Sequence, residues 1–164
     1  MSTRLSHERA KGIKLLVLDV DGVLTDGGLY YGTDGEILKK FHVHDGAGIK
    51  ALLKAGIQVA VISSRQTPTV DIRMEELGVS NVLQGVQDKL ESLNSLVKRL
   101  GIKLDAVACI GDDVADIPML RCVGLAIAVA NARQQVKESA HSLTSAKGGS
   151  GAVREVCDLL LVAR

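Results

Sequence analysis

Residues 13–22 read IKLLVLDVDG, an apolar run, Ile13–Leu18, that ends in two aspartates, Asp19 and Asp21. Such a run is typical of a strand buried on both faces, as in a parallel sheet covered by helices. Polar side chains directly after the strand lie at its carboxyl end, where open α/β sheets bind ligands. The stretch therefore predicts both a buried sheet and a polar site at its edge.

The rest of the chain alternates apolar runs with segments of helical spacing. Further strands are predicted at 57–62, 81–84, 106–110 and 125–129, and helices at 46–55, 68–77, 88–100, 113–121 and 152–162. This alternation is typical of an α/β fold with a doubly wound parallel sheet, Rossmann-like in arrangement. We expect a single domain over residues 1–164, because no linker or repeat divides the chain, with 147–164 as a C-terminal tail and helix.

Residues 27–42 interrupt the alternation. The turn-rich tetrapeptide Gly32-Thr33-Asp34-Gly35 lies between two apolar segments, which predicts a β-hairpin inserted directly after the first strand. The chain's three aromatic residues, Tyr30, Tyr31 and Phe41, all fall in this segment. Because an isolated hairpin is marginally stable in water, we expect them to pack between copies of the chain, with packing inside the hairpin as the alternative.

Composition argues against several classes of partner. The net charge is +1 and no run of Lys and Arg is present, so we expect no nucleic acid partner. We expect no membrane partner, because no apolar run is long enough to cross a bilayer, and residues 1–9 read as a frayed lead-in rather than a signal. Cys109, Cys122 and Cys157 are odd in number and widely spaced, which indicates reduced, buried thiols and a cytoplasmic protein.

Polar side chains follow the predicted strands one after another. In chain order they are Asp19 and Asp21; Ser63, Ser64 and Arg65; Lys89; and Asp112, Asp113 and Asp116. The carboxyl ends of parallel strands meet at one edge of a sheet. Four segments far apart in the sequence are therefore expected to converge on one site.

These residue types suit the hydrolysis of a phosphomonoester. Asp19 would attack phosphorus and form an aspartyl-phosphate, with Asp21 as general acid and then general base. A phosphate dianion repels a carboxylate, so a cation is needed, and Asp19 and Asp112 offer the oxygens that Mg²⁺ prefers. Lys89 and Ser63 would stabilise the phosphoryl oxygens.

Other residues are expected to support this chemistry by positioning the catalytic groups. Gly22 allows a tight turn after Asp21, and Thr25 could hold that turn by local hydrogen bonds. Asp116, four residues after Asp112, could orient Lys89 or a metal-bound water, and Asp113 belongs to the same supporting shell.

At this point the pattern resembles the four ordered motifs of the haloacid dehalogenase superfamily, over nearly the whole chain. The matching residues are Asp19–Thr25, Ser63, Lys89 and Gly111–Asp113 with Asp116. The resemblance implies a nucleophilic Asp19 and an acid/base Asp21. It also implies a metal held by Asp19, Asp112 and the backbone carbonyl of Asp21.

Segments 25–28, 41–46, 84–90 and 148–155 are similar to cap-less members that hydrolyse phosphorylated sugar acids, such as 3-deoxy-D-manno-octulosonate 8-phosphate in lipopolysaccharide precursor synthesis. This similarity implies a homotetramer in which hairpins and tails meet at interfaces and a neighbouring subunit helps to close the site. It also implies substrate contacts from Asp21, Lys89, His42, Val43, His44, Asp45, Gly46, Lys50, Arg65 and Arg73.

Two departures and several alternatives stay open. Ser63-Ser64-Arg65 stands where the family usually has Thr-Gly-Arg, and His44 where Arg is common. The substrate could be another sugar acid, such as a nonulosonate 9-phosphate, and the basic residues could be simple surface charge. His42 and His44 could form one face of a strand. A phosphoacceptor signalling domain would carry its Asp after a middle strand, and a non-catalytic oligomerisation module would not need all four motifs.

Overall fold

A computed structural model describes residues 6–164, except the side chain of Ile37. Six strands form one parallel sheet in the order β5-β4-β1-β6-β7-β8. Their bounds are β1 Leu15–Leu18, β4 Gln58–Ile62, β5 Asn81–Leu83, β6 Val107–Gly111, β7 Leu125–Ala128 and β8 Ser142–Leu143. All residues of β1, β6 and β7 are buried, which explains their unbroken apolar runs. The predicted fold class is confirmed.

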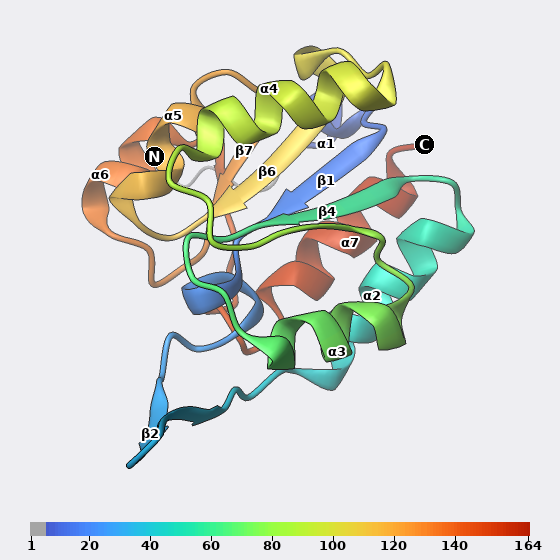
Figure 1. Cartoon of the computed structure of the whole chain (residues 1–164). Helices are drawn as coiled ribbons and strands as arrows, with labels where there is room; N and C mark the ends of the chain where they lie inside the picture. The colour runs from blue at the N-terminus through green and yellow to red at the C-terminus, as the bar shows by residue number, and fades with distance from the viewer. Residues whose placement is uncertain (1–5) are drawn as a thin grey trace.

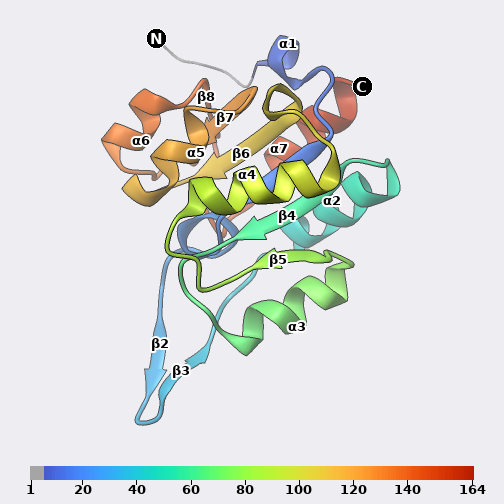
Figure 2. The same ribbon diagram turned by 45° about the horizontal axis from the view of Figure 1, so that its top comes forward.

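Helices cover both faces of the sheet (Figures 1 and 2). One face carries α2 (Val43–Lys54), α3 (Pro68–Leu77) and α7 (Ala152–Val162), with the short α1 (His7–Ala10) beside α7. The other carries α4 (Lys89–Leu100), α5 (Ile117–Leu120) and α6 (Gln134–Ser139). No helix within residues 6–164 is both long and apolar enough to cross a membrane.

The topological switch point of the sheet lies between β1 and β6. From β1 the chain moves outward to β4 and β5 on one side, then returns to β6 on the other side of β1. Leu18 pairs with Val61 of β4 and with Ile110 of β6. Because connections diverge at this point, a crevice opens beyond the strand ends. Asp19 and Asp112 follow the two strands that border it.

The predicted hairpin is present and extends away from the sheet (Figure 2). It consists of antiparallel β2 (Tyr30–Gly32) and β3 (Gly35–Leu38). Tyr30 and Tyr31 are exposed, whereas Phe41 packs against the domain core with Arg73 over its ring. The hairpin therefore leaves its own two tyrosine side chains exposed.

Helix α2 begins three residues before the predicted start at Gly46. His42 is its cap, because His42 Nδ1 accepts a hydrogen bond from His44 N at 3.2 Å. The interpretation of His42 and His44 as one face of a strand is therefore wrong. A histidine cap was not expected, since Ser, Thr, Asp and Asn are the usual capping residues.

Short elements account for the remaining differences. Strand β8 has two residues and α6 has six, too few for a periodic pattern to show. Residues 1–5 of the predicted lead-in lie outside the described part of the chain, but Ser6 caps α1 instead of belonging to a frayed segment. Cys109 and Cys157 are buried thiols as predicted, whereas Cys122 is exposed because it lies in the turn after α5.

Candidate active site

A tight turn, Val20–Leu24, leads the chain away from the end of β1. Gly22 adopts φ +91°, a conformation that other residues rarely take. The hydroxyl oxygen of Thr25 accepts hydrogen bonds from Gly22 N at 3.3 Å and Gly27 N at 3.2 Å. The predicted role of Thr25 as the brace of this turn is confirmed.

The glycine at position 22 also makes room for a carboxylate from another strand. A Cβ atom there would overlap the side chain of Asp112, which enters from the end of β6. The turn after β1 and the loop after β6 therefore fit together at the switch point. Asp112 can approach Asp19 only because residue 22 has no side chain.

A buried lysine lies at the centre of the site. Lys89 Nζ donates to Asp19 Oδ1 at 2.8 Å and to Asp116 Oδ1 at 2.7 Å. The lysine is the first residue of α4, where the Asp88 carboxylate accepts from Glu91 N and caps the helix. Local capping thus directs Lys89 between two carboxylates, one after β1 and the other in the turn after β6.

Negative charge exceeds positive charge in this cluster. Burial and then the charge of Asp116 raise the pKa of Asp19, against the opposing effect of Lys89. Burial and the neighbouring carboxylates, Asp19 first, raise the pKa of Asp112. Burial lowers the pKa of Lys89, but Asp19 and Asp116 outweigh it and raise that pKa overall. One ammonium group does not balance three carboxylates.

The donor set fits a divalent cation. Oxygens of Asp19, Asp112 and Asp116 lie within 4.8 Å of one another. Both carboxylate oxygens of Asp116 already accept hydrogen bonds, Oδ1 from Lys89 and Oδ2 from Asp112 N and Asp113 N. Asp112 Oδ1 is buried and has no hydrogen-bond partner among the described residues. Asp19 and Asp112 are thus the carboxylates left to bind a metal, and two positive charges would neutralise the cluster.

A pocket of about 220 Å³ opens over these groups. Its lining brings together all four segments predicted to converge: Asp19, Asp21, Ser63, Ser64, Arg65, Lys89, Asp112, Asp113, Ala115 and Asp116. Ser63 is buried at the end of β4. Asp113 is exposed and caps the turn that carries Asp116, with its Oδ1 accepting from Val114 N at 2.7 Å.

Several residues predicted to contact substrate lie outside this pocket: His42, Val43, His44, Asp45, Gly46, Lys50 and Arg73. Arg73 forms an ion pair with Glu76 and lies against Gly46 and Phe41. The buried Asp45 accepts from Arg154 N at 2.9 Å, so its carboxylate caps α7, where Gly151 offers no side chain. Their contact with substrate stays a prediction.

Two charged residues that the sequence did not single out, Glu36 and Lys39, contact residues that line the pocket. Lys39 Nζ donates to Asp21 Oδ1 at 2.6 Å. Glu36 pairs with Lys39 and with Arg65, and Arg65 also donates to the Tyr31 hydroxyl at 2.8 Å. The one signal in the sequence was the spacing of Glu36 and Lys39, which lie three residues apart and form an ion pair.

The C-terminal glycine-rich segment packs on the turn after β1 of the same chain. Gly149 N donates to Val23 O at 3.0 Å. A Cβ at Gly148 would overlap the carbonyl oxygen of Gly22, so only glycine permits this backbone contact. Residues near the end of the chain therefore support the turn that carries Asp21.

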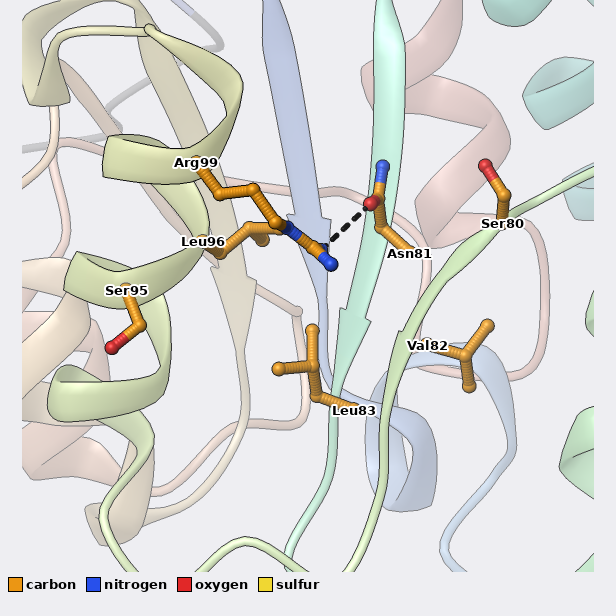
Figure 3. A pocket seen from close by; sticks show the side chains of 7 residues that line it. All are labelled: Ser80, Asn81, Val82, Leu83, Ser95, Leu96 and Arg99. Carbon is orange, nitrogen blue, oxygen red and sulfur yellow. Dashed lines mark hydrogen bonds between the residues drawn. The ribbon is translucent and has the colours of Figure 1, made fainter.

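A larger cavity, about 430 Å³, lies between α4 and the edge strand β5 (Figure 3). Its single charged lining residue, Arg99, already donates to the Asn81 side chain at 3.1 Å, as the dashed line shows. The lining contains no carboxylate or nucleophile arranged for catalysis. The smaller pocket at the switch point is the candidate active site.

A buried aspartate after the first strand, a lysine and an acidic loop after β6 together define a haloacid dehalogenase-like hydrolase, and the model of that family matches residues 78–156. The chain is 46% identical over 157 residues to the 3-deoxy-D-manno-octulosonate 8-phosphate phosphatase of Yersinia pestis, covering 96% of this chain and 84% of the relative. The chain therefore belongs to the family of 3-deoxy-D-manno-octulosonate 8-phosphate phosphatases.

Two further comparisons agree with this assignment. The corresponding phosphatase of Escherichia coli K12 is 46% identical, over 95% of this chain and 83% of the relative. The Moraxella catarrhalis phosphatase, crystallised with magnesium, phosphate and KDO, superposes with a TM-score of 0.94 at 45% identity. That match covers 96% of this chain and 91% of the other.

Proposed function

We propose that this protein hydrolyses 3-deoxy-D-manno-octulosonate 8-phosphate to the free sugar acid and inorganic phosphate. The observation that carries the proposal is the contact of Asp19 with Lys89 beside Asp112, at the switch point of the sheet. The names of the relatives support the choice of substrate. The thiols of Cys109 and Cys157, both buried and unpaired, are consistent with a cytoplasmic location.

Asp19 is the proposed nucleophile. A carboxylate oxygen would form a bond to phosphorus while the bond to the sugar oxygen breaks, leaving an aspartyl-phosphate. Lys89 holds one oxygen of Asp19 and brings positive charge to the place where the phosphoryl oxygens would lie. The Ser63 hydroxyl, in the same pocket, would donate a further hydrogen bond to them.

Asp21 is the proposed acid and base. It lines the pocket two residues after Asp19, so it can give a proton to the departing sugar oxygen. Water then attacks the aspartyl-phosphate, and Asp21 takes back a proton as phosphate leaves Asp19.

Asp19, Asp112 and the backbone carbonyl of Asp21 would hold Mg²⁺. The charge excess of the cluster and the unpartnered Asp112 Oδ1 support this assignment. When bound, the ion supplies positive charge that reduces the repulsion between the phosphate and the carboxylate of Asp19. Asp116 and Asp113 would position Lys89 and the loop without binding the metal.

Recognition of the sugar acid is proposed to involve a second copy of the chain. Of the cationic residues expected to contact substrate, Arg65 and Lys89 line the pocket of one copy. Residues 42–46, Lys50 and Arg73 would act from a neighbouring subunit. The exposed apolar side chains of the hairpin, Tyr30 and Tyr31 among them, support self-association, and a homotetramer is the assembly that the family resemblance implies.

Phosphate release from a panel of sugar and sugar-acid phosphates with Mg²⁺ tests the proposal. We expect the highest kcat/KM for the octulosonate 8-phosphate and loss of turnover in Asp19→Asn. The matched control is Asp105→Asn, at the opposite end of β6, which should keep full activity. Full activity of Asp19→Asn would refute the mechanism. A preference for a nonulosonate 9-phosphate would replace the substrate, and a single retained phosphate without turnover would indicate a phosphoacceptor.

A further inference from the structure

The hairpin contributes a buried ammonium group to the active site. The Lys39 side chain is 1% exposed, although it directly follows β3 of a hairpin that extends away from the sheet. Its Nζ donates to Asp21 Oδ1 at 2.6 Å and to Glu36 Oε2 at 3.4 Å. Burying a lysine is costly unless charged partners compensate. Both of these partners are carboxylates.

Glu36 connects this lysine to the far wall of the pocket. Its carboxylate lies 3.2 Å from Lys39 Nζ and 2.8 Å from Arg65 Nη2. Arg65 in turn lies 3.7 Å from Asp21 Oδ2 and donates to the Tyr31 hydroxyl. Despite burial, Arg65 and Lys39 lower the pKa of Glu36. Two cations, Lys39 and Arg65, thus face two carboxyl groups, those of Glu36 and Asp21.

The geometry of this network fixes the direction of Asp21. One carboxylate oxygen is held by Lys39 and the other faces Arg65, so the side chain is restrained from both sides. A restrained carboxylate meets a leaving oxygen in a defined position, and small errors in such positions cost large factors in rate.

We propose that Lys39 is a positioning residue that holds Asp21 for proton transfer to the leaving group, with Glu36 as the carboxylate that holds Lys39. This inference rests on the proposed acid/base role of Asp21. It makes the hairpin part of the catalytic machinery of its own chain, in addition to any role between subunits.

The leaving group distinguishes this role from a merely structural one. An alcohol needs a proton as it departs, whereas p-nitrophenolate leaves without one. The parameter kcat/KM covers only the steps up to formation of the aspartyl-phosphate, so the later hydrolysis does not affect it. A loss of Asp21 positioning therefore slows alkyl phosphates far more than p-nitrophenyl phosphate.

The experiment measures kcat/KM for a series of alkyl and aryl phosphates, with Mg²⁺, in Lys39→Met and Glu36→Gln. We expect a loss of about 100-fold for alkyl phosphates with Lys39→Met, and less than about 3-fold for p-nitrophenyl phosphate. Glu36→Gln should show the same trend more weakly. The matched control is Lys40→Met, whose exposed side chain pairs with Asp26 and should leave the series unchanged.

A double-mutant cycle separates this inference from the proposed function. In the Asp21→Asn background, Lys39→Met should cause no further loss, because it acts through Asp21. Equal losses for both classes of ester, or additive losses in the double variant, would overturn the positioning role. If Asp21→Asn itself leaves alkyl phosphates unaffected, the acid/base assignment fails instead. Glu36→Gln decides the matter if Lys39→Met does not fold.

Discussion

At the switch point, the carboxylate of Asp112 fills the position that a Cβ atom of Gly22 would take. This contact joins the first and the last of the polar segments in chain order. It makes the absence of one side chain a condition for the position of another.

Gly22→Ala is expected to weaken metal binding. The added methyl group must displace Asp112, and changes of this kind next to a ligand typically cost 10- to 100-fold in metal affinity. Calorimetric titration with Mg²⁺ measures the effect. Gly56→Ala is the matched control, because Gly56 has φ +84° but nothing within 4 Å of its Cβ position. It should lose about 1–2 kcal/mol of stability and keep its metal affinity. Unchanged Mg²⁺ binding by Gly22→Ala would contradict the prediction.

Asp45→Ala is expected to lower stability. The substitution removes the carboxylate that accepts from Arg154 N and leaves that partly buried N–H without its acceptor, which typically costs about 1–3 kcal/mol. Urea denaturation measures the loss, and the exposed Asp34→Ala is the control. The KM for the sugar-acid phosphate decides between the two roles of Asp45. A raised KM with unchanged stability would show that substrate contact, and not the capping of α7, is its main role.

Acidification is expected to destabilise the fold through His141. Burial, with a smaller effect from Arg9, lowers the pKa of His141 below its ordinary 6.5, and its Nδ1 accepts from Ala126 N at 2.9 Å. Below about pH 6.5, His141 binds a proton more readily in the unfolded chain than in the folded one. The free energy of unfolding therefore falls as the pH falls through about 6.5. His141→Asn keeps an acceptor but does not titrate. Its melting temperature should fall less than that of the parent between about pH 7.5 and 5.5. His7→Gln is the control, and a parent-like slope in His141→Asn would exclude this histidine as the cause.

Tyr30→Lys is expected to dissociate the proposed tetramer. Tyr30 is 43% exposed on the hairpin beside other apolar side chains, and a charge there opposes burial between subunits. Sedimentation velocity at several concentrations reports the change. Ile72→Lys, on α3, alters an apolar residue that is 68% exposed and lies outside the hairpin. It should leave the assembly intact. A tetramer that survives Tyr30→Lys but not Ile72→Lys would move the interface to α3.

Most of the sheet could be predicted because its strands are buried on both faces and so carry unbroken apolar runs. The predicted bounds of helix α3 match the observed ones, because Pro68 and Gly78 mark its ends. Strand β8 could not be predicted, since two residues hold no period. The start of α2 was missed because a histidine, rather than a typical capping residue, closes its first turn.

The four strand-end positions of the site were predictable because a parallel sheet brings carboxyl ends together whatever the loops do. Lys39 was not, because nothing local indicates that a hairpin residue folds back to Asp21, 18 positions earlier. The use of Asp45 as a cap for α7 depends on a contact across 109 positions, and sequence spacing carries no information on such a pair.

The contact of Gly148 and Gly149 with residues 22–26 has a consequence for biosynthesis. Asp19 leaves the ribosome before Gly148 and Gly149, whose backbone packs against the turn that follows the nucleophile. A nascent chain that ends before residue 148 can carry all four motifs and still lack the support of that turn. We therefore expect catalytic competence only after residues 148 and 149 have folded onto the turn.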